Sequence, residues 1–109
     1  MISWDDFEKI DIRTGTILEA TDFAGARKPA YQLSIDFGEL GIKKSSAQIT
    51  ALYKIEELIG KQVVAVVNFP VKQIANFFSE CLVLGVYNET NDVVLLQPSV
   101  PVKNGSKIG

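Results

Sequence analysis

Apolar residues along this chain fall mainly into short runs that are typical of β-strands. Two of these runs, Gln62–Val67 and Cys81–Val86, are continuous and rich in β-branched residues, which predicts two buried strands. Three earlier segments alternate apolar and polar residues or lie between turn residues, which predicts three further strands. These three segments are 10–20, 31–37 and 42–49. The chain is therefore predicted to be mainly β.

Two segments carry helical signals. Ser3 precedes a short segment with two acids, which is typical of an N-cap followed by the first turn of a helix. Thr50 precedes the segment 51–60, in which apolar residues recur at helical spacing and Gly60 can end the helix in a left-handed conformation. We expect this second helix to have about two to three turns at a rise of 1.5 Å per residue.

The order of the elements indicates the fold class. Three strands, one helix and two strands, in that order, are the pattern of a five-stranded Greek-key barrel of the OB type. The N-terminal helix precedes this barrel, and a C-terminal extension follows it, with a turn over Asn88–Asp92 and a short strand over Val93–Leu96. We expect residues 1–109 to form one domain, because this length can bury a core. A simple α+β sandwich is the alternative.

The segment 68–80, between the two continuous apolar runs, is polar and aromatic, and we expect it to present a recognition surface. Phe69 directly follows the first run, so we expect it to be packed. Of the neighbours Phe77 and Phe78, at most one can point inward if the segment is extended, which leaves the other as a contact residue. Glu80 either contacts a ligand or holds the loop through backbone amides.

Missing residue types exclude several classes of chemistry. The chain has no histidine, which removes Ser-His-Asp and Cys-His nucleophiles and the HExxH zinc motif. It has no glycine-rich phosphate loop either. We therefore expect a protein that is not an enzyme and needs no metal or cofactor.

The single cysteine and the N-terminus bear on location. Cys81 is the only cysteine, so no intramolecular disulfide can form, which favours a reducing environment. The first residues lack the pattern of a signal peptide, and no apolar stretch approaches the length of a membrane span. We expect a cytoplasmic protein without membrane insertion.

Charge is distributed unevenly along the chain. The net charge is −2, but residues 1–22 contain six acids and two bases, whereas residues 23–54 contain five bases and two acids. The third predicted strand is unusually polar, and we expect it to form one continuous outward surface with Arg13. Lys43 and Lys44 must point to opposite sides of that strand. This pattern favours a binding face.

Several motifs, in their order and spacing, resemble the tRNA-binding domain family, which occurs free-standing and appended to methionyl- and phenylalanyl-tRNA synthetases. They are Asp11-Ile12-Arg13-Thr14-Gly15, Asn68-Phe69-Pro70 with Lys72, and Ser79-Glu80 followed by apolar residues. Within the family, the segments 26–31, 44–50 and 68–80 are most similar to its small free-standing bacterial members. The resemblance covers essentially the whole chain.

The resemblance implies an OB-fold homodimer that acts as an export-related chaperone. Such a protein would bind unfolded or preprotein segments and the translocation motor SecA, with tRNA binding as the activity of the wider family. The synthetase-appended domains have His-Pro and Ala-Asp-Lys where this chain has Phe23-Ala24 and 26–28, and Ser-Gly where it has Ala47-Gln48. These differences favour peptide binding.

Two hypotheses follow for the site. In the first, apolar residues line a peptide pocket and cations surround it. The apolar set is Phe69, Ile74, Phe77 and Phe78, and the cations are Arg27, Lys28, Lys43, Lys44 and Lys72. In the second, the same cations and Arg13 follow a tRNA backbone, and polar side chains contact bases or 2′-hydroxyls. These polar residues are Asn68, Gln73, Ser79 and Glu80.

Apolar residues near both ends of the chain predict dimerisation. A twofold interface would bury them and duplicate the binding face. The predicted interface residues are Trp4, Phe7, Val100, Pro101 and Val102.

Overall fold

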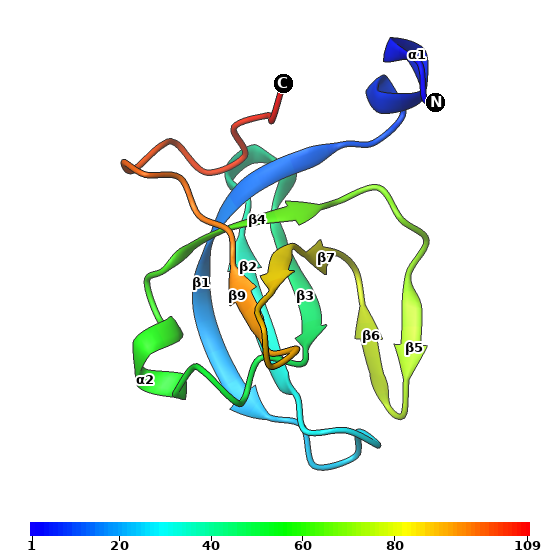
Figure 1. The fold of residues 1–109 in the computed structure, drawn as a ribbon. Coiled ribbons are helices and arrows are strands. Elements are labelled where there is room, and N and C mark those ends of the chain that lie inside the picture. Colours follow the sequence, from blue (N-terminus) through cyan, green and yellow to red (C-terminus); the bar gives the residue numbers. More distant parts are fainter.

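Nine strands, two short α-helices and one 3-10 turn make up the chain, and the structure, a computed structural model, describes all residues 1–109 (Figure 1). The elements are α1 (Trp4–Glu8), β1 (Ile12–Asp22), β2 (Tyr31–Asp36), η1 (Gly38–Leu40), β3 (Ile42–Ala47), α2 (Ile55–Leu58), β4 (Gln62–Val66), β5 (Lys72–Ile74), β6 (Phe77–Ser79), β7 (Leu82–Val83), β8 (Gly85–Tyr87) and β9 (Val93–Leu95).

Five of these strands form an antiparallel sheet in the order β3-β2-β1-β4-β7. The long strand β1 pairs with β2 through its second half and with β4 through its first half, so the sheet curls around β1 into a nearly closed barrel (Figure 1). Two small hairpins, β5–β6 and β8–β9, form separate sheets outside this order. The predicted five-stranded barrel of the OB type is confirmed.

The barrel interior is a cluster of 13 buried residues. The largest fully buried side chains include Phe37, Ile17 and Leu33. Gly15 belongs to this interior because a Cβ there would lie 2.7 Å from Cγ2 of Ile35 and 2.8 Å from the Phe37 ring. Its role is close packing, whereas the irregularity of β1 lies between Ile17 and Glu19.

The first predicted helix is confirmed, and the second is much shorter than predicted. In α1 the Ser3 hydroxyl accepts a hydrogen bond from the Asp6 amide at 3.1 Å, and the Asp6 carboxylate accepts one from the Ser3 amide at 3.0 Å. In α2 only Ile55–Leu58 is helical. The carbonyl of Tyr53 accepts a hydrogen bond from the hydroxyl of Tyr31 at 2.8 Å, which ties the preceding residues to the barrel instead.

The second continuous apolar run, 81–86, does not form one buried strand as predicted. Its first part is β7, which pairs with β4, and its last part is β8, which leaves the barrel and pairs with β9. Only Cys81 in this run is buried, while Leu82 and Val86 are about half exposed. The predicted turn after β8 and the short strand β9 are confirmed.

The segment 68–80 is not simply a loop, because it contains the hairpin β5–β6. Figure 1 shows this hairpin beside the barrel, with its turn at the same end as the connection between β1 and β2. No helix of the structure combines the length and the apolar composition needed to cross a membrane.

Candidate functional site

A small apolar cluster fixes the hairpin β5–β6 in position. Phe77 is buried against Phe23, with ring centroids 5.4 Å apart, and Ala30 completes the buried part of the cluster. Ile74 packs on its edge. Because Phe23 and Ala30 flank the loop between β1 and β2, the hairpin and this loop form one continuous projection from the barrel.

The end of the hairpin is tied to the outer edge of β3. The carboxylate of Glu80 accepts a hydrogen bond from the Lys44 amide at 2.9 Å, and the Glu80 amide donates to the Lys44 carbonyl at 2.7 Å. The hydroxyl of Ser79 accepts a hydrogen bond from the Ser46 amide at 3.3 Å. The buried Ser45 hydroxyl donates to the Cys81 carbonyl at 2.9 Å. The sequence left two roles open for Glu80, and the structure shows the second one: Glu80 holds the segment in place through backbone amides.

Beyond these bonds, a groove of about 400 Å³ lies between β3, the hairpin β5–β6, β7 and the hairpin β8–β9. Nine of its fourteen lining residues are hydrophobic. The lining consists of Ser46, Ala47, Gln48, Ile49, Lys72, Ile74, Ser79, Cys81, Leu82, Val83, Tyr87, Asn91, Val93 and Leu95. Lys72 is the single charged residue among them, so the groove is apolar with one cation on its wall.

A second, smaller hollow of about 230 Å³ adjoins the groove. It adds Phe69 and Pro70 to residues that both spaces share, among them Lys72 and Leu82. Phe69 is 54% exposed, so the expectation that it is packed is wrong. The reason is that β4 ends at Val66, and the chain has left the barrel before it reaches Phe69.

The four apolar residues predicted for one pocket do not come together. The hairpin register pairs Gln73 with Phe78 and Ile74 with Phe77, so the first pair lies on the opposite face from the second. Ile74 lines the groove, Phe77 is buried against Phe23, and Phe78 lies on the other face with 55% of its surface exposed. The prediction that only one of the adjacent phenylalanines points inward is confirmed.

The predicted cations differ in their placement. Arg27 and Lys28 are exposed in the loop between β1 and β2, and Lys72 is exposed at the start of β5. On β3, Lys44 is exposed, whereas Lys43 is half-buried on the same side as Ser45, so the two lysines do point to opposite sides. None of the five forms a salt bridge within the chain.

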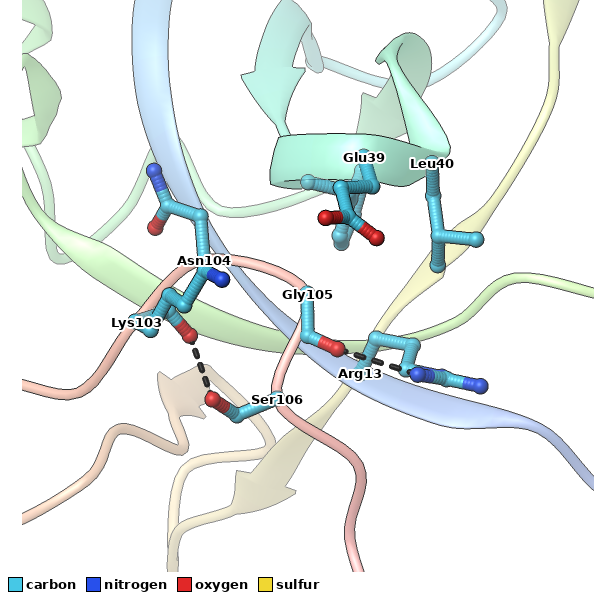
Figure 2. Close-up of a pocket in the computed structure, with 8 residues that line it drawn as sticks. Arg13, Glu39, Leu40, Lys103, Asn104, Gly105 and Ser106 are labelled. Atoms are coloured by element: carbon cyan, nitrogen blue, oxygen red, sulfur yellow. Dashed lines mark hydrogen bonds between the residues drawn. The ribbon is translucent and has the colours of Figure 1, made fainter.

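Arg13 lies apart from these cations, so the predicted continuous surface with β3 does not form. Its Nε donates to the Asp11 carboxylate at 2.6 Å. Its Nη1 donates to the Gly105 carbonyl at 3.0 Å (Figure 2). Together with Lys103 and Ser106 it borders a separate cavity of about 150 Å³. The guanidinium therefore fastens the C-terminal segment to β1.

Asn68 and Gln73 also make contacts within the chain. The Asn68 side chain accepts a hydrogen bond from the Asp11 amide at 2.9 Å and donates one to the Lys9 carbonyl at 2.8 Å. These bonds hold the start of β1 against the end of β4. The side-chain amide of Gln73 donates to the Ala75 carbonyl at 3.0 Å, but the residue stays exposed on the outer face of the hairpin.

The chemistry of Cys81 is that of a buried thiol. Burial raises its pKa to about 11, although the Ser45 hydroxyl and Lys43 partly oppose that effect. A thiol with this pKa is protonated near pH 7 and is a poor nucleophile. No group of three or more His, Cys, Asp or Glu side chains is arranged to hold a metal ion.

Sequence reasoning missed the contribution of β8–β9 to the groove. Tyr87 is 74% exposed and lines the groove together with Val93 and Leu95. Tyr87 directly follows the run 81–86, which was predicted to be a buried strand. The only sequence signal for a role of Tyr87 in binding was its position at the end of that run. That the hairpin β8–β9 lies across from β3 depends on contacts far apart in sequence.

The residues predicted for a dimer interface form two separate groups. Trp4, which is 83% exposed, and Phe7 border a hollow with Ile2 and Gly109. The segment 100–102 lies near α2 and β4, where Gln62 exchanges two hydrogen bonds with Val102. Figure 1 shows α1 and this bend of the C-terminal segment on opposite sides of the barrel.

Comparison with known proteins places this geometry in a family. The family model for the tRNA binding domain matches residues 12–107. The chain belongs to the tRNA-binding domain family. The match covers all nine strands, and therefore both walls of the groove and both faces of the hairpin β5–β6.

The relatives of this tRNA-binding domain include parts of larger enzymes. The methionine–tRNA ligase of Bacteroides fragilis is 36% identical over 107 residues, which are 98% of this chain and 16% of the ligase. That of Nanoarchaeum equitans is 35% identical over 108 residues, 99% of this chain and 14% of the ligase. The domain thus spans about a sixth of the length of these curated relatives.

Two solved structures match from end to end. The chaperone CsaA from Bacillus anthracis has 57% sequence identity and a TM-score of 0.95, and the match covers 100% of this chain and 99% of that one. The CsaA chaperone protein from Picrophilus torridus has 56% identity and a TM-score of 0.95, with 100% of both chains covered.

Proposed function

We propose that this domain is an export-related, chaperone-like protein that binds unfolded or preprotein polypeptide segments in the groove between β3 and the two hairpins. The observation that carries the proposal is the groove itself, which has about 400 Å³ of space and nine hydrophobic residues among fourteen. This volume lies within the range of about 300–1,000 Å³ that is usual for ligand pockets. The similarity of this chain to proteins described as CsaA chaperones supports the same role.

The composition of the groove suits an apolar chain segment better than a nucleic acid. Apolar patches on a folded surface are favourable sites for the side chains that an unfolded protein exposes. Only Lys72 adds charge to the lining, whereas a groove that follows a phosphate backbone carries several cations. Strong phosphate binding is therefore not expected here.

A second function, tRNA binding, is favoured by the family and by the opposite face of the same hairpin. Phe78 and Gln73 are cross-strand neighbours on that face, and both are exposed. Arg27 and Lys28 are exposed in the adjoining loop. An exposed aromatic ring that stacks on an unpaired base, with cations beside it for phosphates, is a usual arrangement for single-stranded RNA.

A pair of matched variants separates the two functions. Tyr87→Ser removes an exposed aromatic side chain from the groove, and Phe78→Ser removes one from the outer face. Each variant is titrated with a peptide of alternating valine and glutamine and with unfractionated tRNA, at two salt concentrations. Because a base that stacks on one aromatic side chain gains about 1–3 kcal/mol, Phe78→Ser should weaken tRNA binding by about 5- to 150-fold. Because burial of a large apolar side chain is worth about 1.5–3 kcal/mol, Tyr87→Ser should weaken peptide binding by about tenfold or more.

We expect Tyr87→Ser to weaken the peptide alone and Phe78→Ser to weaken tRNA alone. Peptide affinity should change little with salt, whereas tRNA affinity should fall steeply, because phosphate contacts release counterions. A peptide that does not bind, or whose affinity depends on Phe78 and not on Tyr87, would contradict the proposed groove.

We further propose that residues 1–109 act as one binding domain in the cytoplasm, that the protein is a homodimer, and that SecA is a partner. The exposed Trp4 supports the dimer, because an aromatic side chain exposed beside a hollow is a favourable anchor for a second copy. The partner SecA rests on the family resemblance. Light scattering that gives a mass of 12.0 kDa would contradict the dimer.

A further inference from the structure

The barrel has two sheet edges, and both line the groove. The sheet order begins at β3 and ends at β7, and no ladder of hydrogen bonds joins these two strands. Residues 46–49 contribute to one wall of the groove and residues 81–83 contribute to the other. The groove is therefore the place where the barrel stays open.

At one end of β3 the edge is already covered. The amide and carbonyl of Lys44 bond to Glu80, and the amide of Ser46 bonds to the Ser79 hydroxyl. These bonds establish that Lys44 and Ser46 direct their backbone groups away from β2. Alternate residues of a strand direct their backbone groups to the same edge. Gln48 directly follows the last residue of β3, Ala47, and is the next position in this row.

At the other end of β3 the edge is free. No hydrogen bond within the chain uses the amide or carbonyl of Gln48, and the residue is exposed. Free donors and acceptors along a sheet edge are a template on which an extended chain adds as another strand. This edge opens into an apolar groove, so an added strand would bury side chains as well as pair its backbone.

We propose that the groove binds polypeptide by strand addition, so that an extended segment pairs its backbone with the Ser46 carbonyl and with the amide and carbonyl of Gln48. The inference rests on the proposed peptide-binding function and specifies its mode of recognition. Every second side chain of the segment then faces the groove wall, near Tyr87 and Val93, and the others face away. Main-chain pairing makes recognition tolerant of sequence, which suits unfolded segments.

Charge complementarity specifies the segment further. The only charge in the groove lining is Lys72, and it forms no salt bridge within the chain. Lys44, exposed at the covered end of the β3 edge, is also free of salt bridges. The favoured occupant is therefore apolar at alternate positions and has an acidic residue toward the end near Lys72.

The test uses a synthetic peptide, acetylated and amidated, with alternating valine and glutamine and one terminal glutamate. A series of analogues replaces one backbone amide at a time by an ester, which removes an N–H donor and keeps the side chain. Strand addition predicts a loss of about tenfold in affinity at alternate positions and less than about twofold at the positions between them, because only one set of amides faces β3.

The outcomes separate this inference from the function on which it rests. Peptide binding that is equally sensitive or equally insensitive to all ester positions overturns strand addition and leaves peptide binding in the groove intact. If the unmodified peptide does not bind, both proposals fail.

Two measurements on the protein complete the test. Gln48→Pro removes the free amide and should lose about tenfold in peptide affinity, whereas Gln48→Ala keeps the amide and should stay within about twofold. In the unaltered protein, the peptide should slow hydrogen exchange of the Gln48 amide and leave the Lys44 amide, already bonded to Glu80, unchanged. A Gln48 amide that the bound peptide leaves unprotected, or that tRNA alone protects, overturns the inference.

Discussion

Replacing Phe77 by alanine should release the hairpin β5–β6 without unfolding the barrel. Phe77 is buried in the cluster of three residues that fixes the hairpin to the loop between β1 and β2, and it is absent from the 13-residue barrel core. Deletion of a buried phenylalanine costs about 3–5 kcal/mol, and loss of an aromatic pair accounts for about 0.5–1.5 kcal/mol. Since the cluster is small and lies near the surface, we expect about 3 kcal/mol.

Hydrogen exchange measures this effect strand by strand. A local loss of about 3 kcal/mol should accelerate exchange of hairpin amides by about a hundredfold, because each 1.4 kcal/mol is tenfold. Amides of β4 between Val63 and Ala65 should keep their rates, since they pair with β1 inside the barrel. The matched control is Phe78→Ala, which removes an exposed ring from the neighbouring position and should change stability by less than about 0.5 kcal/mol.

Two results would refute this reasoning. If hairpin amides exchange at the same rate in Phe77→Ala and in the unaltered protein, the cluster does not hold the hairpin. If β4 amides accelerate as much as hairpin amides, the hairpin and the barrel unfold as one unit.

Three further predictions concern the barrel packing, the turn of the hairpin β5–β6 and the buried thiol. Gly15→Ala should destabilise the fold by about 1–3 kcal/mol in denaturant titrations, because its Cβ would lie 2.7 Å from Ile35, and unchanged stability would contradict the close packing. Ala75→Gly should stabilise it by about 0.5–1 kcal/mol, because Ala75 has a φ of 53°, and a loss of stability would show that the turn is unstrained. The raised pKa of Cys81 means that the unfolded state releases its proton first, so stability should fall as the pH rises from 9.0 toward 11. A Cys81→Ala variant that loses stability equally over that range would assign the loss to other groups.

Local patterns predicted the elements whose formation depends on local contacts. The alternation in β1 and β2 and the capping residue Ser3 each act within a few residues, and all three predictions are confirmed. The helix α2 is shorter than its apolar spacing indicated, because Tyr31 binds the carbonyl of Tyr53 from a distant strand.

The candidate site depends mostly on contacts between residues that are far apart in sequence. For this reason several predictions about the site were wrong. The apolar run 81–86 looks uniform in sequence, but its second half pairs with β9 instead of the barrel. Arg13 and Asn68 hold the fold together through partners far away in sequence, the Gly105 and Lys9 carbonyls, which no local pattern indicates. What sequence did indicate correctly was the polar character of β3, whose edge carries the proposed recognition.

The most direct test of the account is a measurement of amide chemical shifts during titration with the alternating peptide. If the groove binds extended polypeptide, the largest changes should appear at residues 46–49, at Val83 and at Tyr87, and the amides of Gln73 and Phe78 should stay unchanged. Changes confined to the outer face around Phe78, with the groove residues unaffected, would contradict the proposed function.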